Sequence, residues 1–138
     1  MALDGQVALV TDGGSALGRA IALALAARGV KVVVTGPVER SLGETVGEIA
    51  YGGGKARHVV AAPRDPVAVG SALARAVEVF GRLDLVVVAN DDPSDVACIR
   101  DVATRTSGIA PRVLEPTPAE RAMAPEELAQ LVVANSSR

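Results

Sequence analysis

The chain has 138 residues, which suit one domain with its own buried core, and its formal net charge is −2. A weak negative charge gives no basic field for phosphates, so nucleic acid is not an expected partner. Cys98 is the single cysteine, and no apolar run reaches the roughly 18 residues that a membrane span needs. Because the start also lacks a signal-peptide pattern, we expect one cytoplasmic domain over residues 1–138, without a membrane partner.

Valine-rich segments alternate with amphipathic segments along the first two thirds of the chain. Buried parallel strands, apolar on both faces, are predicted at Gln6–Thr11, Val30–Thr35, Ala56–Ala61 and Leu83–Ala89. Helices are predicted at Ser15–Arg28, Val38–Ala50 and Pro66–Phe80, where apolar residues recur at helical spacing. Asp65 suits the start of the third helix as an N-cap, and Gly81 suits its end. This repeated alternation predicts an α/β fold with a doubly wound parallel sheet.

The last third of the chain is less regular. A helix is predicted at Asp92–Thr106, and a fifth strand at Ile109–Leu114. Pro111 removes a donor from that strand, so we expect it at an edge of the sheet. A final helix is predicted at Pro125–Ala134, after a surface connection that begins at Glu115.

A glycine-rich turn follows the first predicted strand and leads into the first predicted helix. In dinucleotide-binding folds, this arrangement holds pyrophosphate at the start of the helix. Small residues let the backbone approach phosphate, and free N–H groups receive its negative charge. Gly13, Gly14 and Gly18 meet part of this requirement.

The turn TDGGSALG and the stretches ARGVKVVVTG, GGGKARHVV and VEVFGRLDLVVVAN resemble the short-chain dehydrogenase/reductase family. The resemblance is close over residues 3–90, and residues 91–138 are a shortened and divergent part. It implies a three-layer, Rossmann-like sheet of about five strands in the order 3-2-1-4-5. It also implies NAD or NADP as the candidate cofactor, with these binding positions: Thr11, Gly13, Gly14, Ser15, Leu17, Gly18 and Asn90.

The family pattern TGxxxGxG is incomplete in this turn. Asp12 stands where the first glycine belongs, and Ala16 stands where the second belongs. A carboxylate beside phosphate adds repulsion, unless the Asp12 side chain turns outward or caps the helix. After the second strand, Thr35–Pro37 replaces the Asp or Arg that distinguishes NAD from NADP, unless Arg40 reaches back. At the end of the third strand, Ala62 stands in place of an Asp that meets adenine in the family.

The family's catalytic residues are a Ser and a Tyr-x-x-x-Lys, in which the lysine lowers the pKa of the tyrosine. The single tyrosine, Tyr51, precedes Lys55, but the three glycines between them predict a loop instead of a helical turn. Residues 108–118 resemble the family's sixth strand, so the stretch with the catalytic residues is missing, and we expect none. The C-terminal part also resembles other Rossmann domains, such as the regulatory nucleotide-binding domains of potassium transport proteins.

Three other polar features have a structural explanation. His58 lies beside valines in a strand, with no Ser or Cys near it in sequence, which favours a packed or edge histidine over a base. Cys98 lies on a predicted helix and is interpreted as a core residue. Asp91, Asp92 and Asp95 suit an acidic loop and a helix start, so no metal site is predicted.

Three functional hypotheses remain. The favoured one is a non-catalytic member of the fold that acts by protein association, as a homo-oligomer or with a full-length homologue. The alternative is a weak NAD(P)- or adenine-nucleotide-binding protein, acting as a sensor or a residual oxidoreductase. The third is an internally deleted reductase whose fold persists without a selected role, and aggregation of the isolated chain would favour it over the first.

Overall fold

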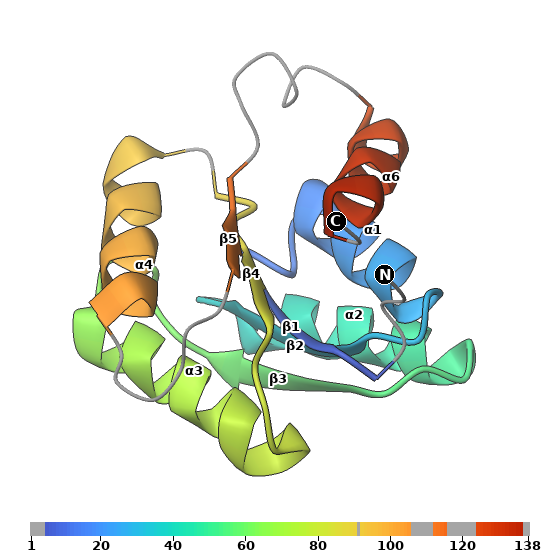
Figure 1. Ribbon diagram of the computed structural model, residues 1–138, viewed down its shortest axis with the longest axis horizontal. Coiled ribbons are helices and arrows are strands. Elements are labelled where there is room, and N and C mark those ends of the chain that lie inside the picture. Colours follow the sequence, from blue (N-terminus) through green and yellow to red (C-terminus); the bar gives the residue numbers. More distant parts are fainter. Residues whose placement is uncertain (1–4, 91, 106–111, 116–123, 137–138) are drawn as a thin grey trace.

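Strands and helices alternate along the chain in the computed structural model (Figure 1), which describes residues 5–90, 92–105, 112–115 and 124–136. The strands are β1 (Val7–Thr11), β2 (Lys31–Gly36), β3 (Ala56–Val60), β4 (Leu85–Val87) and β5 (Arg112–Leu114). The helices are α1 (Ala16–Ala26), α2 (Glu39–Tyr51), α3 (Pro66–Phe80), α4 (Pro93–Arg105) and α6 (Pro125–Ser136). All strand pairs are parallel, and the sheet order is β3-β2-β1-β4-β5, which confirms the predicted fold.

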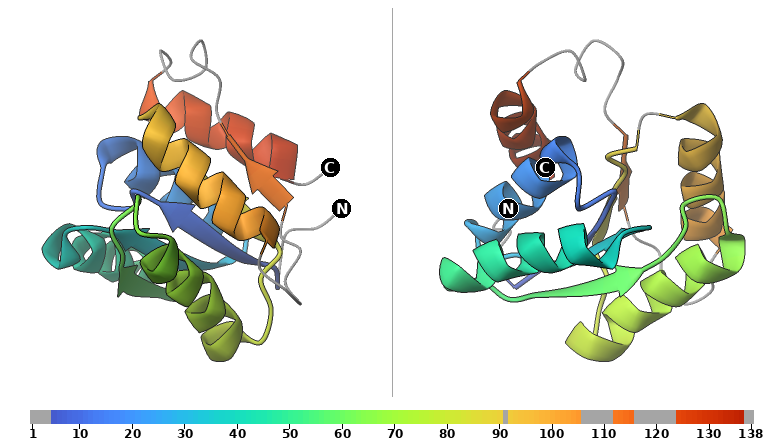
Figure 2. Two further views of the ribbon diagram at one scale, coloured as in Figure 1. Left: turned by 90° about the vertical axis from the view of Figure 1, so that its left-hand side faces the viewer. Right: turned by 180° about the vertical axis from the view of Figure 1, so that it is seen from behind.

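The sheet separates two hydrophobic clusters, one covered by α1, α2 and α6 and the other by α3 and α4 (Figure 2). Along β1, Ala8 and Val10 enter the first cluster, while Val7 and Leu9 enter the second. This division follows from strand geometry, because successive side chains point to opposite faces. All of β1 is buried, as predicted for a central parallel strand.

The prediction that every early strand is buried on both faces is wrong for β3. This strand is an edge strand of the sheet, where helices cover it less, and Arg57 and His58 are exposed. The predicted fourth strand is also too long, because β4 spans Leu85–Val87 only. Its predicted flanks, Leu83 and Ala89, are nevertheless buried.

α3 begins and ends where the sequence predicts. The Asp65 carboxylate accepts hydrogen bonds from the N–H groups of Val67 and Ala68, and Pro66 occupies the first turn. Gly81 follows the helix with a φ of 84°, a left-handed conformation that side chains rarely adopt. Local capping chemistry is therefore sufficient to place this helix.

The C-terminal part completes both layers of helices. β5 pairs with β4 at the second edge of the sheet, as predicted, while residues 109–111 of the predicted strand lie outside the described residues. Residues 116–123 of the predicted connection also lie outside them. α6 packs along α1, and its Leu128 and Val132 enter the first cluster (Figure 1). None of the helices in the described ranges combines the length and the apolar character that crossing a membrane requires.

Candidate functional site

The carboxyl ends of β1 and β4 are tied together by one side chain. Thr11 Oγ1 donates to the carbonyl oxygen of Val87 at 3.4 Å and accepts from the N–H of Ala89 at 3.1 Å. The chain leaves β1 toward β2 on one side and later returns to β4 on the other. Thr11 therefore lies at the topological switch point, where open α/β sheets bind ligands.

The turn from β1 to α1 is organised by Ser15. Its Oγ accepts from the N–H of Gly18 at 3.0 Å and donates to the carbonyl oxygen of Asp12 at 2.7 Å. Ser15 is therefore the N-cap of α1, the role that the sequence left open for Asp12. Asp12 has a φ of 51°, so it adopts the left-handed conformation that a glycine at this position would adopt at no steric cost.

The glycines of the turn are required by the packing of the chain itself. A Cβ on Gly13 would lie 2.5 Å from Val34 Cβ, and one on Gly18 would lie 2.1 Å from the carbonyl oxygen of Asp12. A Cβ on Gly14 would meet α2 at a similar separation, 2.5 Å from Ser41 Cβ. The close approach of β1, α1 and α2 thus explains these glycines, so they are not by themselves a sign of bound phosphate.

Below the turn lies a small cavity at the ends of the strands, here called the strand-end cavity. It has a volume of about 10 Å³ and is lined by Leu9, Thr11, Asp12, Thr35, Gly36, Ala61, Pro63, Val69, Ala72, Asn90 and Ile99. Thr35 Oγ1 and Asn90 Oδ1 are both buried there without a hydrogen-bond partner among the described residues. Such atoms cost free energy unless water or a ligand satisfies them.

The structure brings the predicted binding positions together in two groups. Thr11 and Asn90 line the strand-end cavity, and residues 13–18 form the adjoining turn. Leu17 is half-buried and packs against the first hydrophobic cluster, so its side chain already has a structural role. Thr35 was not predicted as a binding position, although its hydroxyl at the end of a buried strand was a usable signal.

An arginine joins the two segments that border the strand-end cavity. The Arg64 guanidinium, in the β3–α3 loop, pairs with Asp92 and Asp95 at 2.7 Å each. The Ser94 N–H and, next, Arg64 lower the pKa of Asp92, while both carboxylates raise the pKa of Arg64. These two acids are therefore accounted for by a cation of the protein itself, while Asp91 lies outside the described residues. Within those residues, no group of three His, Cys, Asp or Glu side chains could hold a metal ion.

The Tyr51–Lys55 pair lies at the opposite end of the sheet from the strand-end cavity. Tyr51 ends α2 and is 96% exposed, and Lys55 precedes the first residue of β3. His58 is on the edge strand, 3.6 Å from a Glu39 carboxylate oxygen. Burial, and next the Asp101 carboxylate, raise the pKa of the Cys98 thiol, which does not favour a nucleophile.

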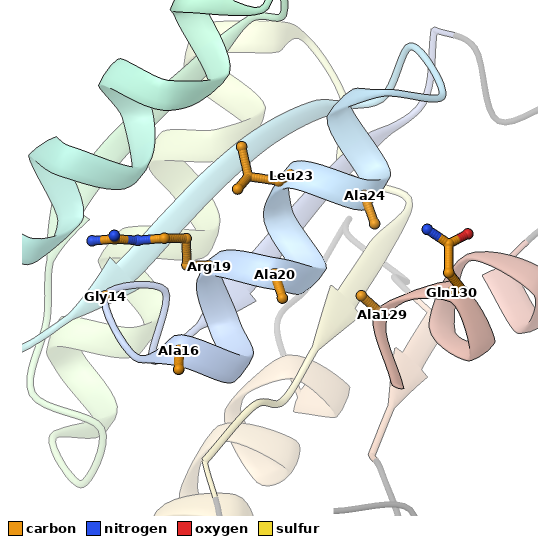
Figure 3. A pocket seen from close by; sticks show the side chains of 8 residues that line it. All are labelled: Gly14, Ala16, Arg19, Ala20, Leu23, Ala24, Ala129 and Gln130. Atoms are coloured by element: carbon orange, nitrogen blue, oxygen red, sulfur yellow. The ribbon is translucent and has the colours of Figure 1, made fainter. Parts of the chain in front are cut away.

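A wider groove lies on the outer surface between α1 and α6 (Figure 3). Its volume is about 670 Å³, and it is lined by Gly14, Ala16, Arg19, Ala20, Leu23, Ala24, Ala129 and Gln130. The groove was not predicted from the sequence, although three alanines four residues apart on α1, Ala16, Ala20 and Ala24, line it. Arg19 lies at its border and pairs with Glu48 at 3.1 Å.

The fold and the turn agree with the comparison with known proteins. A family model described as short chain dehydrogenase matches residues 6–90. The chain belongs to this family. The part that matches holds β1 to β4 and the whole turn, and it ends at Asn90. The matched region of this short-chain dehydrogenase domain therefore includes every residue that lines the strand-end cavity except Ile99.

Curated relatives are much longer than this chain. Versicolorin reductase stcU of Emericella nidulans is 48% identical over 85 residues, which cover 61% of this chain and 32% of the relative. The short-chain reductase NovJ of Streptomyces niveus is 42% identical over 82 residues, or 59% of this chain and 31% of the relative. The short-chain dehydrogenase domain thus spans about a third of the length of these relatives.

Two solved structures resemble different shares of the chain. A hydroxysteroid dehydrogenase from Escherichia coli matches with a TM-score of 0.61 and 28% identity, covering 62% of this chain and 37% of its own. A metagenomic short-chain oxidoreductase in complex with NADP matches with a TM-score of 0.77 at 17% identity, covering 100% of this chain and 93% of its own. The second likeness concerns the fold alone, but it extends over the C-terminal part as well.

Proposed function

We propose that this domain binds the adenosine part of a nucleotide at the strand-end cavity and acts as a binding module without hydride transfer of its own. The observation that carries the proposal is the pair of buried, unpartnered oxygens, Thr35 Oγ1 and Asn90 Oδ1, beside one cavity. A hydroxyl can donate or accept and an amide oxygen accepts, so together they suit a base or a ribose. NAD and NADP are the candidate dinucleotides.

The start of α1 supports the same proposal. The first turn of the helix begins at the exposed Ala16. The N–H groups of Ala16 and Leu17 have no acceptor within the helix, while that of Gly18 already donates to Ser15 Oγ. A phosphate attached to the adenosine would find there the positive end of the helix dipole. Asp12 opposes this attraction with its charge, so we expect weak binding. The structural neighbour that holds NADP over a similar length of chain is consistent with a domain of this size binding a dinucleotide.

The absence of hydride transfer is proposed from the position of the tyrosine. Tyr51 is the single tyrosine of the chain, and it lies at the amino end of the sheet, away from the strand-end cavity. An acid/base must lie within hydrogen-bond reach of the reacting group. NADPH mixed with carbonyl compounds should therefore stay unoxidised by this chain while still binding to it.

Binding is tested by calorimetric titration with AMP, NADH and NADPH. Thr35→Val keeps the shape of the side chain and removes the unpartnered hydroxyl, so we expect equal or higher stability and about fivefold weaker binding. Thr104→Val is the control, because this exposed threonine on α4 bonds only to its own helix. If the wild type binds with saturation and Thr35→Val binds with the same affinity, the binding site lies outside the strand-end cavity. No saturable binding by the wild type would refute the proposal.

A second candidate function, association with another chain, is favoured by the outer edge of β5, which pairs with no further strand among the described residues. Arg112 N–H donates to the Asp84 carbonyl, and the Leu114 carbonyl accepts from Val88, so both face β4. Because strand residues alternate in direction, the backbone groups of Val113 face away from β4. An unpaired strand edge is a template for another strand.

Sedimentation of the purified chain over a range of concentrations tests this second function. We expect a dimer that Val113→Pro abolishes, because proline removes an outward N–H that β4 does not use. Val113→Thr, which keeps the N–H and the branched shape, is the control. A wild type that stays monomeric at all concentrations would exclude self-association.

A further inference from the structure

The two segments that border the strand-end cavity are joined by ion pairs. Pro63 lines the cavity from the β3–α3 loop, and Asn90 lines it from the end of β4. Arg64 follows Pro63 directly, and its Nη2 lies 2.7 Å from Asp92 Oδ2, just beyond Asn90. The guanidinium therefore joins the two segments beside the cavity, while Arg64 itself is not among the residues that line it.

A second contact fixes the orientation of the guanidinium. Arg64 Nε lies 2.7 Å from Asp95 Oδ1, in the first turn of α4. Asp92 Oδ1 also accepts the N–H of Ser94 at 2.8 Å, so this carboxylate is held from both sides. A planar guanidinium with two fixed acceptors is a geometrically specific link. We call Arg64, Asp92 and Asp95 together the Arg64 clasp.

The strand-end cavity is too small for an organic ligand while the Arg64 clasp is in place. A volume of about 10 Å³ suits a single water molecule. Sites for small organic ligands typically have volumes of about 300 Å³ or more. A base therefore needs a wider opening. Separation of the β3–α3 loop from the start of α4 would supply it, and this movement breaks contacts of Arg64.

We propose, on the basis of the nucleotide-binding function proposed above, that the Arg64 clasp is an autoinhibitory contact that keeps the strand-end cavity closed in the free domain. Opening it exposes Thr35 Oγ1 and Asn90 Oδ1 to the ligand. The Arg64 side chain is 61% exposed, although that of Asp95 is only 17% exposed, so the inhibition is modest and sensitive to salt. Nucleotide binding to this domain is then regulated by ionic strength through a contact that lies outside the turn.

Adenosine is the probe that separates the clasp from simple charge attraction, because it has no phosphate to be attracted by Arg64 or repelled by the carboxylates. Arg64→Gln removes the charge and keeps a side chain of similar length. We expect it to bind adenosine about fivefold more tightly, the limit for a broken exposed ion pair. Wild-type affinity should rise from low to high salt, and that of Arg64→Gln should not.

Arg75→Gln is the matched control. Arg75 pairs with Glu78 at 2.7 Å on the exposed side of α3 and has a similar exposure to Arg64. This variant should bind adenosine like the wild type, with the same salt dependence. Hydrogen exchange of segments 61–65 and 92–95, measured without ligand, should be faster in Arg64→Gln and unchanged in Arg75→Gln.

The outcomes distinguish the clasp from the nucleotide-binding function. Equal or weaker adenosine binding by Arg64→Gln, beside a wild type that binds, overturns the clasp and leaves the function standing. Binding by no variant refutes the nucleotide function, and the clasp is then decided by exchange. Faster exchange in Arg64→Gln alone supports a clasp over the cavity, and unchanged exchange overturns it.

Discussion

Residues 6–90 and residues 92–136 contribute to the same two hydrophobic clusters, but they differ in how closely they resemble known proteins. The first region matches the family model and is 48% identical to a curated relative, whereas the second lies outside that match. Yet the second region supplies α6 to one cluster and α4 to the other. Without these helices, one side of each cluster would be open to water.

The difference shows that the two regions are constrained by different physics. In the turn after β1, backbone atoms approach so closely that the residue type is fixed at single positions, as at Gly18. A covering helix needs only apolar residues at helical spacing and about the right volume. Sequence identity therefore persists in the first region, while the fold of the second agrees with a structural neighbour at 17% identity over the whole chain.

The largest effect is expected when a core side chain of the second region is truncated, because this lowers the free energy of unfolding. Leu128 is 1% exposed in the first hydrophobic cluster, so Leu128→Ala should lower the free energy of unfolding by about 3 kcal/mol. Leu131→Ala in the same helix is the control, because Leu131 is only half-buried and should cost less. Urea unfolding followed by circular dichroism measures both. Equal, small losses would mean that α6 contributes little to the core.

The next effect concerns the first region. Gly18→Ala places a Cβ 2.1 Å from the Asp12 carbonyl oxygen, and we expect a loss of about 2 kcal/mol because backbone must shift. Gly43→Ala, in the middle of α2, meets nothing within 4 Å and should stabilise the domain by about 0.5–1 kcal/mol. The thermal midpoints of the two variants should therefore shift in opposite directions from that of the wild type. A tolerated Gly18→Ala would contradict the close packing of the turn.

A smaller effect separates charge from conformation at Asp12. Asp12→Asn removes the charge and keeps the left-handed conformation accessible, so NADH binding should tighten about fivefold. Asp12→Gly removes the charge and the steric cost together and should bind equally well, if charge is the obstacle. Tighter binding by the glycine variant alone, measured by calorimetry, would assign the obstacle to backbone strain.

The sequence predicted those features that depend on neighbouring residues. The cap at Asp65, the end at Gly81 and the buried pattern of β1 are local signals, and all three are confirmed. The exposure of β3 was not foreseen, because it follows from the position of the strand at the sheet edge. The groove between α1 and α6 was also missed, since helices distant in sequence form it.

In the candidate site, too, the residues marked by local sequence were predicted, and the contacts that depend on tertiary packing were not. Thr11 and Asn90 were predicted because Thr11 ends one predicted strand, Asn90 directly follows another, and both match family positions. The pairing of Arg64 with Asp92 and Asp95 was not foreseen, since it joins residues about 30 positions apart whose proximity depends on the packing of α3 beside α4. Asp92 and Asp95 were correctly interpreted as a loop residue and part of a helix start, but their cation was not identified. Tertiary electrostatics is thus the part that pattern reasoning did not supply.

The smallest expected effect tests the link between the two regions, since Arg64 belongs to the first and Asp92 to the second. The Ser94 N–H and then Arg64 lower the pKa of Asp92 in the folded domain below its ordinary value. The ionised carboxylate therefore stabilises the fold above about pH 4, and this contribution is lost as the pH falls through the folded pKa. Asp92→Asn should therefore lower the thermal midpoint slightly at neutral pH, where the ionised carboxylate contributes, and the midpoints of the variant and the wild type should converge as the pH falls below about 4. Glu78→Gln, which removes the exposed partner of Arg75 within the first region, is the control, and an identical change in acid sensitivity for both variants would mean that the contact between the regions has no special weight.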